Sequence, residues 1–413
     1  MDTKDTNIEA FFALLRAGIW ENVMVLGRAK RQSRVNGEGV MVNGSPLTIS
    51  DGVDWNKVLD LAEEQSVVGL LAAGIETVQG SSQSEAAKSS AGLKVHGSPL
   101  VPKPIALQFV GRTVQLEQCN QAMNQFIAEL VEKMREAGIY TLLVKGQGVA
   151  RCYERPLWRS CGDVDFFMST ANYMRAKEFL IPLASSVEKE YVRERHLEMT
   201  IDGWVVELHG SLYSGLSKKI EKELDDVSVD TFHKGSVRAW MDDKVQVFQL
   251  SVENEVFYVF THILQHFYKG GIGLRQICDW CRLLWTYRSE LDVAKLEGRL
   301  RRAGLMTSWK AFAAFAVDFL GMPIESMPFY ADGDKWKRKA TRIKDFVLMS
   351  GNFGHNRDHS YYEKYPYLVR KCVSCGRRMG DLAHHARIFP IDSLRFFPAM
   401  LVNGVRSAMN GEG

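Results

Sequence analysis

The stretch from residue 140 to residue 168 constrains the fold more than any other part of the chain. It begins as an apolar strand that ends at Lys145-Gly146, passes through a short helical stretch, and enters a second apolar strand at Asp163-Val164-Asp165. Side chains two positions apart on a strand point to the same face, so Asp163 and Asp165 are expected to lie together. Because adjacent carboxylates repel each other, a fold that holds them side by side usually supplies a cation.

Residues 196–209, HLEMTIDGWVVELH, form the clearest hairpin pattern in the chain. Their central Asp-Gly is a two-residue turn typical of antiparallel strands, and it sets the register. One face then carries only apolar side chains. The polar face pairs Glu198 with Glu207 and His196 with His209. Like charges across a sheet are destabilising, so this face either depends on solvent screening or lies near a metal ion.

Helical patterns flank this mixed segment on both sides. We expect an N-terminal helical region over residues 1–110, a mixed α/β domain over 111–230, and a C-terminal helical region over 231–413. Residues 54–78 have apolar side chains close to a helical period. Residues 80–99 are rich in Ser, Gly, Ala and Lys and are expected to form an exposed loop with room for a weak helix inside it.

Two helices are expected soon after Ser251, which is a plausible N-cap. The first carries His262 and His266 one turn apart. The sequence lacks the glutamate of a HExxH zinc motif, so a polar lining of a cleft is favoured over a zinc site. A plain buried or capping role is the other alternative. The second helix carries Arg275 and Asp279 one turn apart. The simplest interpretation is an intrahelical ion pair, which stabilises a helix by roughly a few tenths of a kcal/mol.

Composition narrows the class of protein. A length of 413 residues allows two or three domains, and contents of 46% hydrophobic and 24% charged residues are those of an ordinary globular protein. The net charge of +3 is too mild to indicate a nucleic-acid partner. The sequence shows neither a secretory signal nor the roughly 18 uninterrupted apolar residues of a membrane span, so we expect a cytoplasmic protein without a membrane partner.

The cysteines agree with a reducing compartment. There are 7 of them, an odd number, scattered along the chain. Cys372 and Cys375 form a CxxC pair, but a structural zinc needs four ligands and no second pair stands nearby. Two ordinary thiols are therefore the favoured interpretation.

The turn Lys145-Gly146-Gln147-Gly148 is typical of a phosphate site. A strand that turns through glycines into a helix presents backbone N–H groups to an anion. Its simpler alternative is a tight strand-to-helix turn. Glu207, on a later strand, can join Asp163 and Asp165 as a third carboxylate, and three such groups suit Mg²⁺, which prefers hard oxygen ligands.

Together these motifs resemble the nucleotidyltransferase superfamily with the DNA polymerase β-like catalytic fold, and more narrowly an uncharacterised bacterial nucleotidyltransferase family. The resemblance is carried by Lys145-Gly146, Arg159, Asp163-Val164-Asp165-Phe166-Phe167, Glu207-Leu208-His209, His262, His266, Leu274-Arg275, Asp279 and Gly351-Asn352-Phe353-Gly354. It implies an α+β fold, in which a small mixed sheet with helices is flanked by N- and C-terminal helical regions. The implied reaction transfers a nucleoside monophosphate from a nucleoside triphosphate to an acceptor hydroxyl and releases pyrophosphate.

The resemblance also implies roles for individual residues. The catalytic residues and metal ligands would be Asp163, Asp165 and Glu207, with Glu207 as third ligand or base. They would hold two Mg²⁺ ions, or Mn²⁺. The nucleotide and phosphate ligands would be Lys145, Gly146, Gln147, Gly148 and Arg159. The cleft would be lined by Glu198, His209, His262, His266 and Arg275.

One position departs from the wider superfamily. A glycine-serine pair is usual at the phosphate turn, where this chain has Gly146-Gln147. Gln147 cannot copy the contact of the serine hydroxyl with phosphate, so Lys145 or the backbone amides would take it over. The departure keeps open a catalytically inactive nucleotide-binding or regulatory module. A third alternative is a toxin-like enzyme that modifies a protein or RNA, which the lack of a basic stripe makes less favoured.

Overall fold

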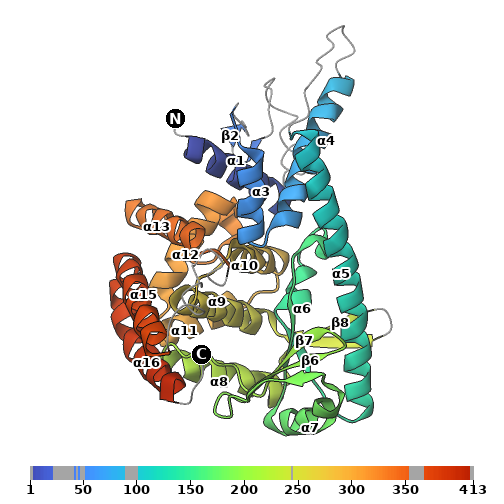
Figure 1. The fold of residues 1–413 in the computed structure, drawn as a ribbon, viewed down its shortest axis with the longest axis vertical. Helices are drawn as coiled ribbons and strands as arrows, with labels where there is room; N and C mark the ends of the chain where they lie inside the picture. The colour runs from blue at the N-terminus through green and yellow to red at the C-terminus, as the bar shows by residue number, and fades with distance from the viewer. Residues whose placement is uncertain are drawn as a thin grey trace.

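A mixed sheet of seven strands organises the middle of the chain (Figure 1). The structure, a computed structural model, describes residues 3–21, 41–42, 45–46, 52–88, 101–242, 245–352 and 367–409. The strand order is β5-β6-β7-β4-β3-β9-β8. The strands are β3 (Leu142–Val144), β4 (Asp163–Phe167), β5 (Ser186–Val187), β6 (His196–Ile201), β7 (Trp204–His209), β8 (Val237–Asp242) and β9 (Val245–Leu250). A separate two-stranded sheet pairs β1 (Met41–Val42) with β2 (Ser45–Pro46).

The hairpin of β6 and β7 has the register that the sequence predicts. Glu198 lies opposite Glu207, and the pairing runs from His196 with His209 to Ile201 with Trp204. Side chains of the apolar face are buried except at Trp204, and those of the polar face are partly exposed. The prediction of the core face is therefore confirmed.

Strand β4 lies between β3 and β7 and determines where the two aspartates point. It runs antiparallel to β3 and parallel to β7. Val164 and Phe166 pack in a core with the helices α5 and α7, whereas Phe167 packs in the core of the helical body. Because side chains alternate along a strand, Asp163 and Asp165 point to the same side as Phe167, toward the helical body.

The helical pattern expected after residue 231 begins later than predicted. Residues 237–250 instead form the antiparallel hairpin of β8 and β9, and β9 lies parallel to β3 through the pair Leu142 and Phe248. Val245, Val247 and Leu250 are buried. The sheet thus extends beyond the segment that the sequence assigns to it, because burial on alternate residues stabilises a strand here.

In the described ranges before β3, the helices are α1 (Thr3–Ile19), α3 (Trp55–Glu64), α4 (Val68–Lys88) and α5 (Lys103–Glu136). The predicted helical stretch of residues 54–78 is confirmed, with a break at Ser66, whose φ is 55°. The helix that the sequence allows within residues 80–99 is present in the first part of that segment, where α4 continues to Lys88. The helix formers Gln, Glu, Ala and Lys in that part outweigh its serines and glycine. Residues 89–100 lie outside the described residues.

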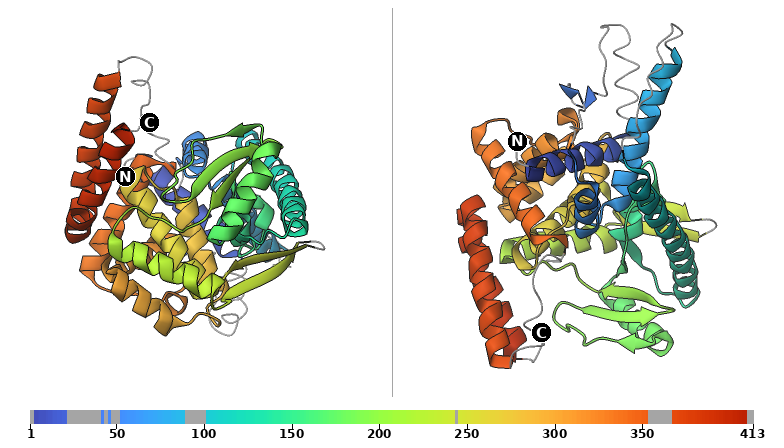
Figure 2. Two further views of the ribbon diagram at one scale, coloured as in Figure 1. Left: turned by 90° about the horizontal axis from the view of Figure 1, so that it is seen from below. Right: turned by 45° about the horizontal axis from the view of Figure 1, so that its top comes forward.

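The remaining helices are α6 (Gly146–Ala150), α7 (Thr170–Leu180), α8 (Lys218–Phe232), α9 (Val252–Lys269), α10 (Leu274–Thr286), α11 (Val293–Ala303), α12 (Met306–Leu320), α13 (Asp334–Ser350), α15 (Tyr367–Ile388) and α16 (Pro390–Met409). Three short 3₁₀ turns are η1 (Pro156–Trp158), η2 (Ile181–Leu183) and η3 (Ile324–Ser326). Figures 1 and 2 show α15 and α16 next to each other, on the opposite side of the helical body from the sheet.

Two hydrophobic cores lie on the two faces of the sheet. The smaller one packs α5 and α7 against one face, with Met123 and Tyr173 as fully buried members. The larger one fills the helical body and includes both Phe11 of α1 and Phe396 of α16. N-terminal and C-terminal helices therefore share one core. The division into three domains stays a prediction.

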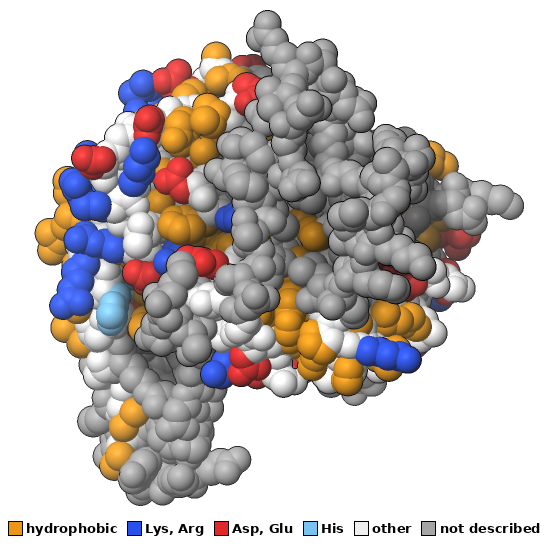
Figure 3. Space-filling view, turned by 90° about the horizontal axis from the view of Figure 1, so that it is seen from above, with side chains coloured by type: hydrophobic (Ala, Val, Ile, Leu, Met, Phe, Trp, Pro, Cys, Tyr) orange, Lys and Arg blue, Asp and Glu red, His pale blue; other side chains and the backbone are white. Residues whose placement is uncertain are grey.

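None of the helices in the described ranges is both long and apolar enough to cross a membrane. On the face shown in Figure 3, Lys and Arg side chains gather along one edge, with Asp, Glu and hydrophobic side chains among them. The side chains of Cys372 and Cys375, and the residues Phe353-Gly354, lie outside the described part of the chain.

Candidate active site

Three carboxylates converge on the side of the sheet that faces the helical body. Strands β4 and β7 are parallel, and Asp165 is in register with Glu207. Oxygen atoms of Asp163, Asp165 and Glu207 all lie within 4.8 Å of one another. The negative charge of Asp165, together with burial, raises the pKa of Asp163. The sequence prediction that these three residues lie together is thus correct in its geometry.

Lysine and histidine side chains compensate two of the three carboxylates. Lys145 Nζ lies 2.7 Å from Asp165 Oδ1, and His209 Nε2 lies 2.9 Å from the same oxygen. Glu207 Oε2 lies 3.2 Å from the Nε2 atoms of both His196 and His209. Asp163 differs, because no described residue donates a hydrogen bond to its carboxylate or forms an ion pair with it.

The imidazoles of His196 and His209 change the pKa of Glu207, and the carboxylates in turn change the pKa of His209. Burial alone would raise the pKa of Glu207, but hydrogen bonds from His196 and His209 hold it below its usual value. Burial alone would lower the pKa of His209, but hydrogen bonds to Asp165 and Glu207 raise it. Ionised carboxylates only accept hydrogen bonds, so Nε2 of His209 carries a proton. The two imidazoles therefore favour the ionised form of Glu207.

The turn before α6 holds Lys145 in an unusual backbone conformation. Its φ is 58° and its ψ is −147°, a region that residues with a side chain rarely adopt. The side chain is 15% exposed and lies in the acidic cluster. Burial opposes its charge, but Asp165 and its neighbours raise the pKa of Lys145 well above the usual value. Strain of this kind persists where the surrounding structure imposes it, as at functional sites.

Gln147 and Gly148 do not place side-chain atoms in the cleft. The amide of Gln147 donates to Asn120 Oδ1 at 2.7 Å and contacts Met123 and Cys161, on the side facing α5. A Cβ on Gly148 would lie 2.3 Å from the side-chain nitrogen of Gln249 in β9. A larger residue at position 148 would therefore have to displace the side-chain amide of Gln249.

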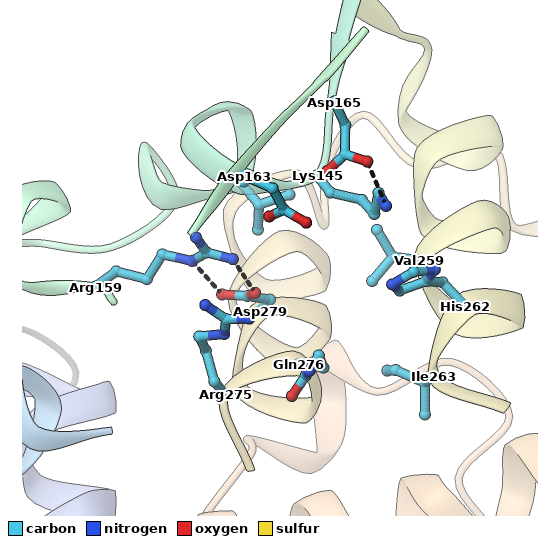
Figure 4. Close-up of a pocket in the computed structure, with 12 residues that line it drawn as sticks. Lys145, Arg159, Asp163, Asp165, Val259, His262, Ile263, Arg275, Gln276 and Asp279 are labelled. Atoms are coloured by element: carbon cyan, nitrogen blue, oxygen red, sulfur yellow. Dashed lines mark hydrogen bonds and ion pairs between the residues drawn. The ribbon is translucent and has the colours of Figure 1, made fainter. Parts of the chain in front are cut away.

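A pocket with about 480 Å³ of empty space opens beside the carboxylates (Figure 4). It lies between α6, β4, α9 and α10. It is lined by Lys145, Gly146, Val149, Arg159, Asp163, Asp165, Val259, His262, Ile263, Arg275, Gln276 and Asp279. Glu198 is not among these residues. It lies opposite Glu207 in the hairpin, and burial together with the charge of Glu207 raises its pKa.

The expected ion pair between Arg275 and Asp279 is wrong. Asp279 instead accepts two hydrogen bonds from Arg159, at 3.1 and 2.7 Å, and one from the Tyr153 hydroxyl at 2.9 Å. Arg159 and Asp279 are 4% and 5% exposed. Arg275 donates to the backbone carbonyl of Ser160 at 2.9 Å. Because Arg159 and Asp279 are far apart in the sequence, no local pattern predicts this buried pair.

His262 and His266 form a pair of their own on α9. Their Nε2 atoms are 2.8 Å apart, and only His262 lines the pocket. Burial, and then the charge of Lys145, lowers the pKa of His262 well below its usual value and that of His266 to about 3. Within the described ranges, neither histidine belongs to a cluster of three metal-binding side chains. The expected polar lining of the cleft therefore agrees with the position of His262.

Sequence reasoning left several residues out of the site. Gln276 lines the pocket, Tyr258 lies beside Lys145, and His196 contacts Glu207. Burial raises the pKa of Tyr258 to about 12. A signal existed for His196, which the hairpin register places beside His209, and the two rings stack with centroids 4.8 Å apart. No local pattern indicates Tyr258 or Gln276.

The fold is that of a nucleotidyltransferase core flanked by helices. Its elements are a strand, a glycine turn with a short helix, a strand with the DxD motif, and a third acidic residue on the adjacent strand. A family model described as uncharacterised nucleotidyltransferase matches residues 51–321, and the chain belongs to this family. The matched region covers α3 to α12 and so includes the carboxylates, the pocket and both helices behind it. Comparison with curated proteins finds no match, and comparison with solved structures finds none either.

Proposed function

We propose that this protein is a Mg²⁺-dependent nucleotidyltransferase that transfers a nucleoside monophosphate from a nucleoside triphosphate to an acceptor hydroxyl. The observation that carries the proposal is the convergence of Asp163, Asp165 and Glu207 within 4.8 Å at the edge of an open pocket. In the reaction, the acceptor oxygen forms a bond to the α-phosphorus, and the bond from that phosphorus to the leaving pyrophosphate breaks. Membership of the nucleotidyltransferase family supports the reaction class.

The donor set fits a hard divalent cation. All three side chains offer carboxylate oxygens, which Mg²⁺ and Mn²⁺ prefer. The carboxylate of Asp163 has no partner among the described residues, so a cation there would compensate an uncompensated charge. In the proposed site Asp163 and Asp165 bind two ions and Glu207 completes the set. Bound Mg²⁺ supplies charge stabilisation for the attacking and leaving oxygens.

The remaining residues have separate proposed roles. Glu207 accepts hydrogen bonds from two imidazoles, which suits a metal ligand better than a base. Asp163 and Asp165 are assigned to the metal ions, so the proton that the hydroxyl loses passes to solvent. Lys145 and the backbone of the Lys145-Gly146 turn contact phosphate. Arg159, already paired with Asp279, holds α10 against the loop that precedes β4.

The test is binding of each nucleoside triphosphate with Mg²⁺, measured by calorimetry on the wild type and on Asp163→Asn/Asp165→Asn. The wild type is expected to bind at least one metal–nucleotide complex and the double variant to lose it. Asp202→Asn is the matched control, since it makes the same chemical change at the exposed hairpin turn. Equal binding by wild type and double variant, or binding by neither, contradicts the proposal.

The alternative of an inactive module rested on Gln147 in place of serine. In the structure that side chain bonds to α5 and leaves the pocket side of the turn to Lys145 and Gly146. The substitution therefore removes no charged or metal-binding group from the site. Release of pyrophosphate in the presence of an acceptor separates the enzyme from such a module.

A further inference from the structure

Arg275 has no carboxylate partner among the described residues, unlike the other two cations of the pocket. Lys145 pairs with Asp165, and Arg159 is held by a carboxylate of α10. Arg275 donates through Nη1 to the carbonyl of Ser160, and its Nε is buried without an acceptor. An arginine that is partly buried and unpaired costs free energy unless something else uses its charge.

Gln276, the next residue of α10, is also incompletely bonded. It is 7% exposed, and its amide nitrogen donates to Asn352 at 2.8 Å, while its Oε1 has no hydrogen-bond partner in the part of the chain that the structure describes. Figure 4 shows Arg275 and Gln276 on the opposite side of the pocket from Asp165. This end of the pocket thus presents one unused donor and one unused acceptor.

Two charged groups of the pocket have no hydrogen-bonded or ion-paired counter-charge among the described residues: the carboxylate of Asp163 and the guanidinium of Arg275. They feel each other's opposite charge only at longer range. A cation alone satisfies the first, and an anion alone satisfies the second. A metal-bound polyphosphate satisfies both, because its cation meets the carboxylate and its oxygens meet the guanidinium. Arginine is suited to this role, since its planar group can donate two parallel hydrogen bonds to phosphate.

We propose that Arg275 binds the polyphosphate of the nucleotide, so that the polyphosphate lies across the pocket from Asp163 to the first turn of α10. This inference rests on the proposed function and adds to it a binding residue from outside the sheet. The bond to Ser160 fixes the guanidinium beside the strand that carries Asp163. Burial and the nearby Arg159 lower the pKa of Arg275 more than the negative charges of Asp279 and Asp163 raise it, so an anion bound beside the guanidinium would stabilise its charge.

Calorimetric titration with inorganic tripolyphosphate in Mg²⁺ tests the proposal. The variants are Arg275→Gln, Arg275→Lys and, as matched control, Arg288→Gln in the exposed turn just after α10. A charge-assisted hydrogen bond predicts that Arg275→Gln weakens binding roughly ten- to a hundredfold. The affinity of Arg275→Lys for tripolyphosphate should lie between those of the wild type and Arg275→Gln, because lysine keeps the charge but lacks the planar guanidinium. The control should bind as the wild type does.

Binding of Mn²⁺ in the absence of phosphate, measured by electron paramagnetic resonance, tests whether Arg275 contacts phosphate directly or only supports the structure of the metal site. The proposal requires Mn²⁺ affinity to be unchanged in Arg275→Gln. It is overturned if that variant or Arg275→Lys also loses Mn²⁺, because Arg275 would then act only through Ser160 on the carboxylate strand. It is equally overturned if Arg275→Gln binds tripolyphosphate as tightly as the wild type, or if the wild type binds none.

A second position keeps the test decisive if the Arg275 variants do not fold. Gln276→Glu places a negative charge beside the guanidinium and should weaken tripolyphosphate binding while Mn²⁺ binding persists. An unchanged affinity for tripolyphosphate in this variant overturns the proposal. Failure of the proposed function appears differently, as metal–nucleotide binding that survives Asp163→Asn/Asp165→Asn.

Discussion

The side-chain amide of Gln147 donates a hydrogen bond to Asn120 Oδ1 across 2.7 Å and so joins α6 to the long helix α5. Both side chains are buried, and Asn120 in turn donates to the carbonyls of Leu157 and Arg159. The residue that departs from the superfamily pattern therefore fixes the Lys145-Gly146 turn from the side that faces α5.

Restoring the usual serine is expected to harm the protein. In Gln147→Ser the shorter side chain leaves Asn120 Oδ1 without this donor and opens a small cavity, so the free energy of unfolding should fall by about 1–3 kcal/mol. Affinity for metal–nucleotide should not rise. Urea unfolding and calorimetry measure the two quantities. A gain in nucleotide affinity at unchanged stability would show that residue 147 faces the cleft.

Removing Lys145 should make the acidic cluster more dependent on metal. Lys145→Met deletes the cation that lies 2.7 Å from Asp165, and breaking a buried ion pair costs about 3–5 kcal/mol. The midpoint of thermal unfolding in EDTA should therefore drop. Added Mg²⁺ should raise that midpoint more than in the wild type, because the ion no longer competes with the ammonium group. An equal Mg²⁺-dependent increase in both proteins contradicts the prediction.

Stability of the metal-free protein should fall on both sides of about pH 6.5, the usual pKa of histidine. The folded pKa of His266 is about 3, so the unfolded chain binds more protons between these values and stability rises with pH over that range. The pKa of His209 is raised, so its contribution is complete below pH 6.5, roughly, and is lost as pH rises through the folded value.

Urea unfolding in EDTA over a series of pH values measures these two slopes. His266→Gln should flatten the acidic side and His209→Gln the alkaline side. His233→Gln, at the exposed end of α8, should leave both slopes as in the wild type. An alkaline slope that persists without His209 would assign it to another group.

Local patterns account for the parts of the fold that the sequence predicts well. The Asp-Gly turn and strict alternation determine the hairpin register, and the DxD spacing determines the direction of Asp163 and Asp165. Strand β9 also alternates, with buried side chains at Val245, Val247 and Gln249, but Gln246 and Gln249 are polar and weaken the apolar pattern. The sequence analysis therefore assigned these residues to the helical C-terminal region and did not predict the two strands.

Contacts between distant segments account for the parts that the sequence does not predict. Asp279 has Arg275 one helical turn away, which favours a local pair on spacing alone. In the fold, η1 and the loop that follows it bring Arg159 against α10, and two hydrogen bonds from one guanidinium outweigh the exposed intrahelical alternative. Arg159 lies 120 positions before Asp279 in the sequence, so only the tertiary packing determines whether Asp279 pairs with Arg159 or with Arg275.

The pair of Arg159 and Asp279 gives a last test of this packing. Asp279→Asn leaves a buried guanidinium uncompensated and should lower the free energy of unfolding by about 3–5 kcal/mol. Arg159→Met/Asp279→Leu removes both charges and should be the more stable variant, since apolar replacement of a buried pair is often nearly neutral. Urea unfolding of the wild type and both variants measures the difference. If the double variant is less stable than Asp279→Asn, the pair contributes more than mutual compensation of charge, and the Tyr153 hydroxyl bonded to Asp279 becomes the next position to change.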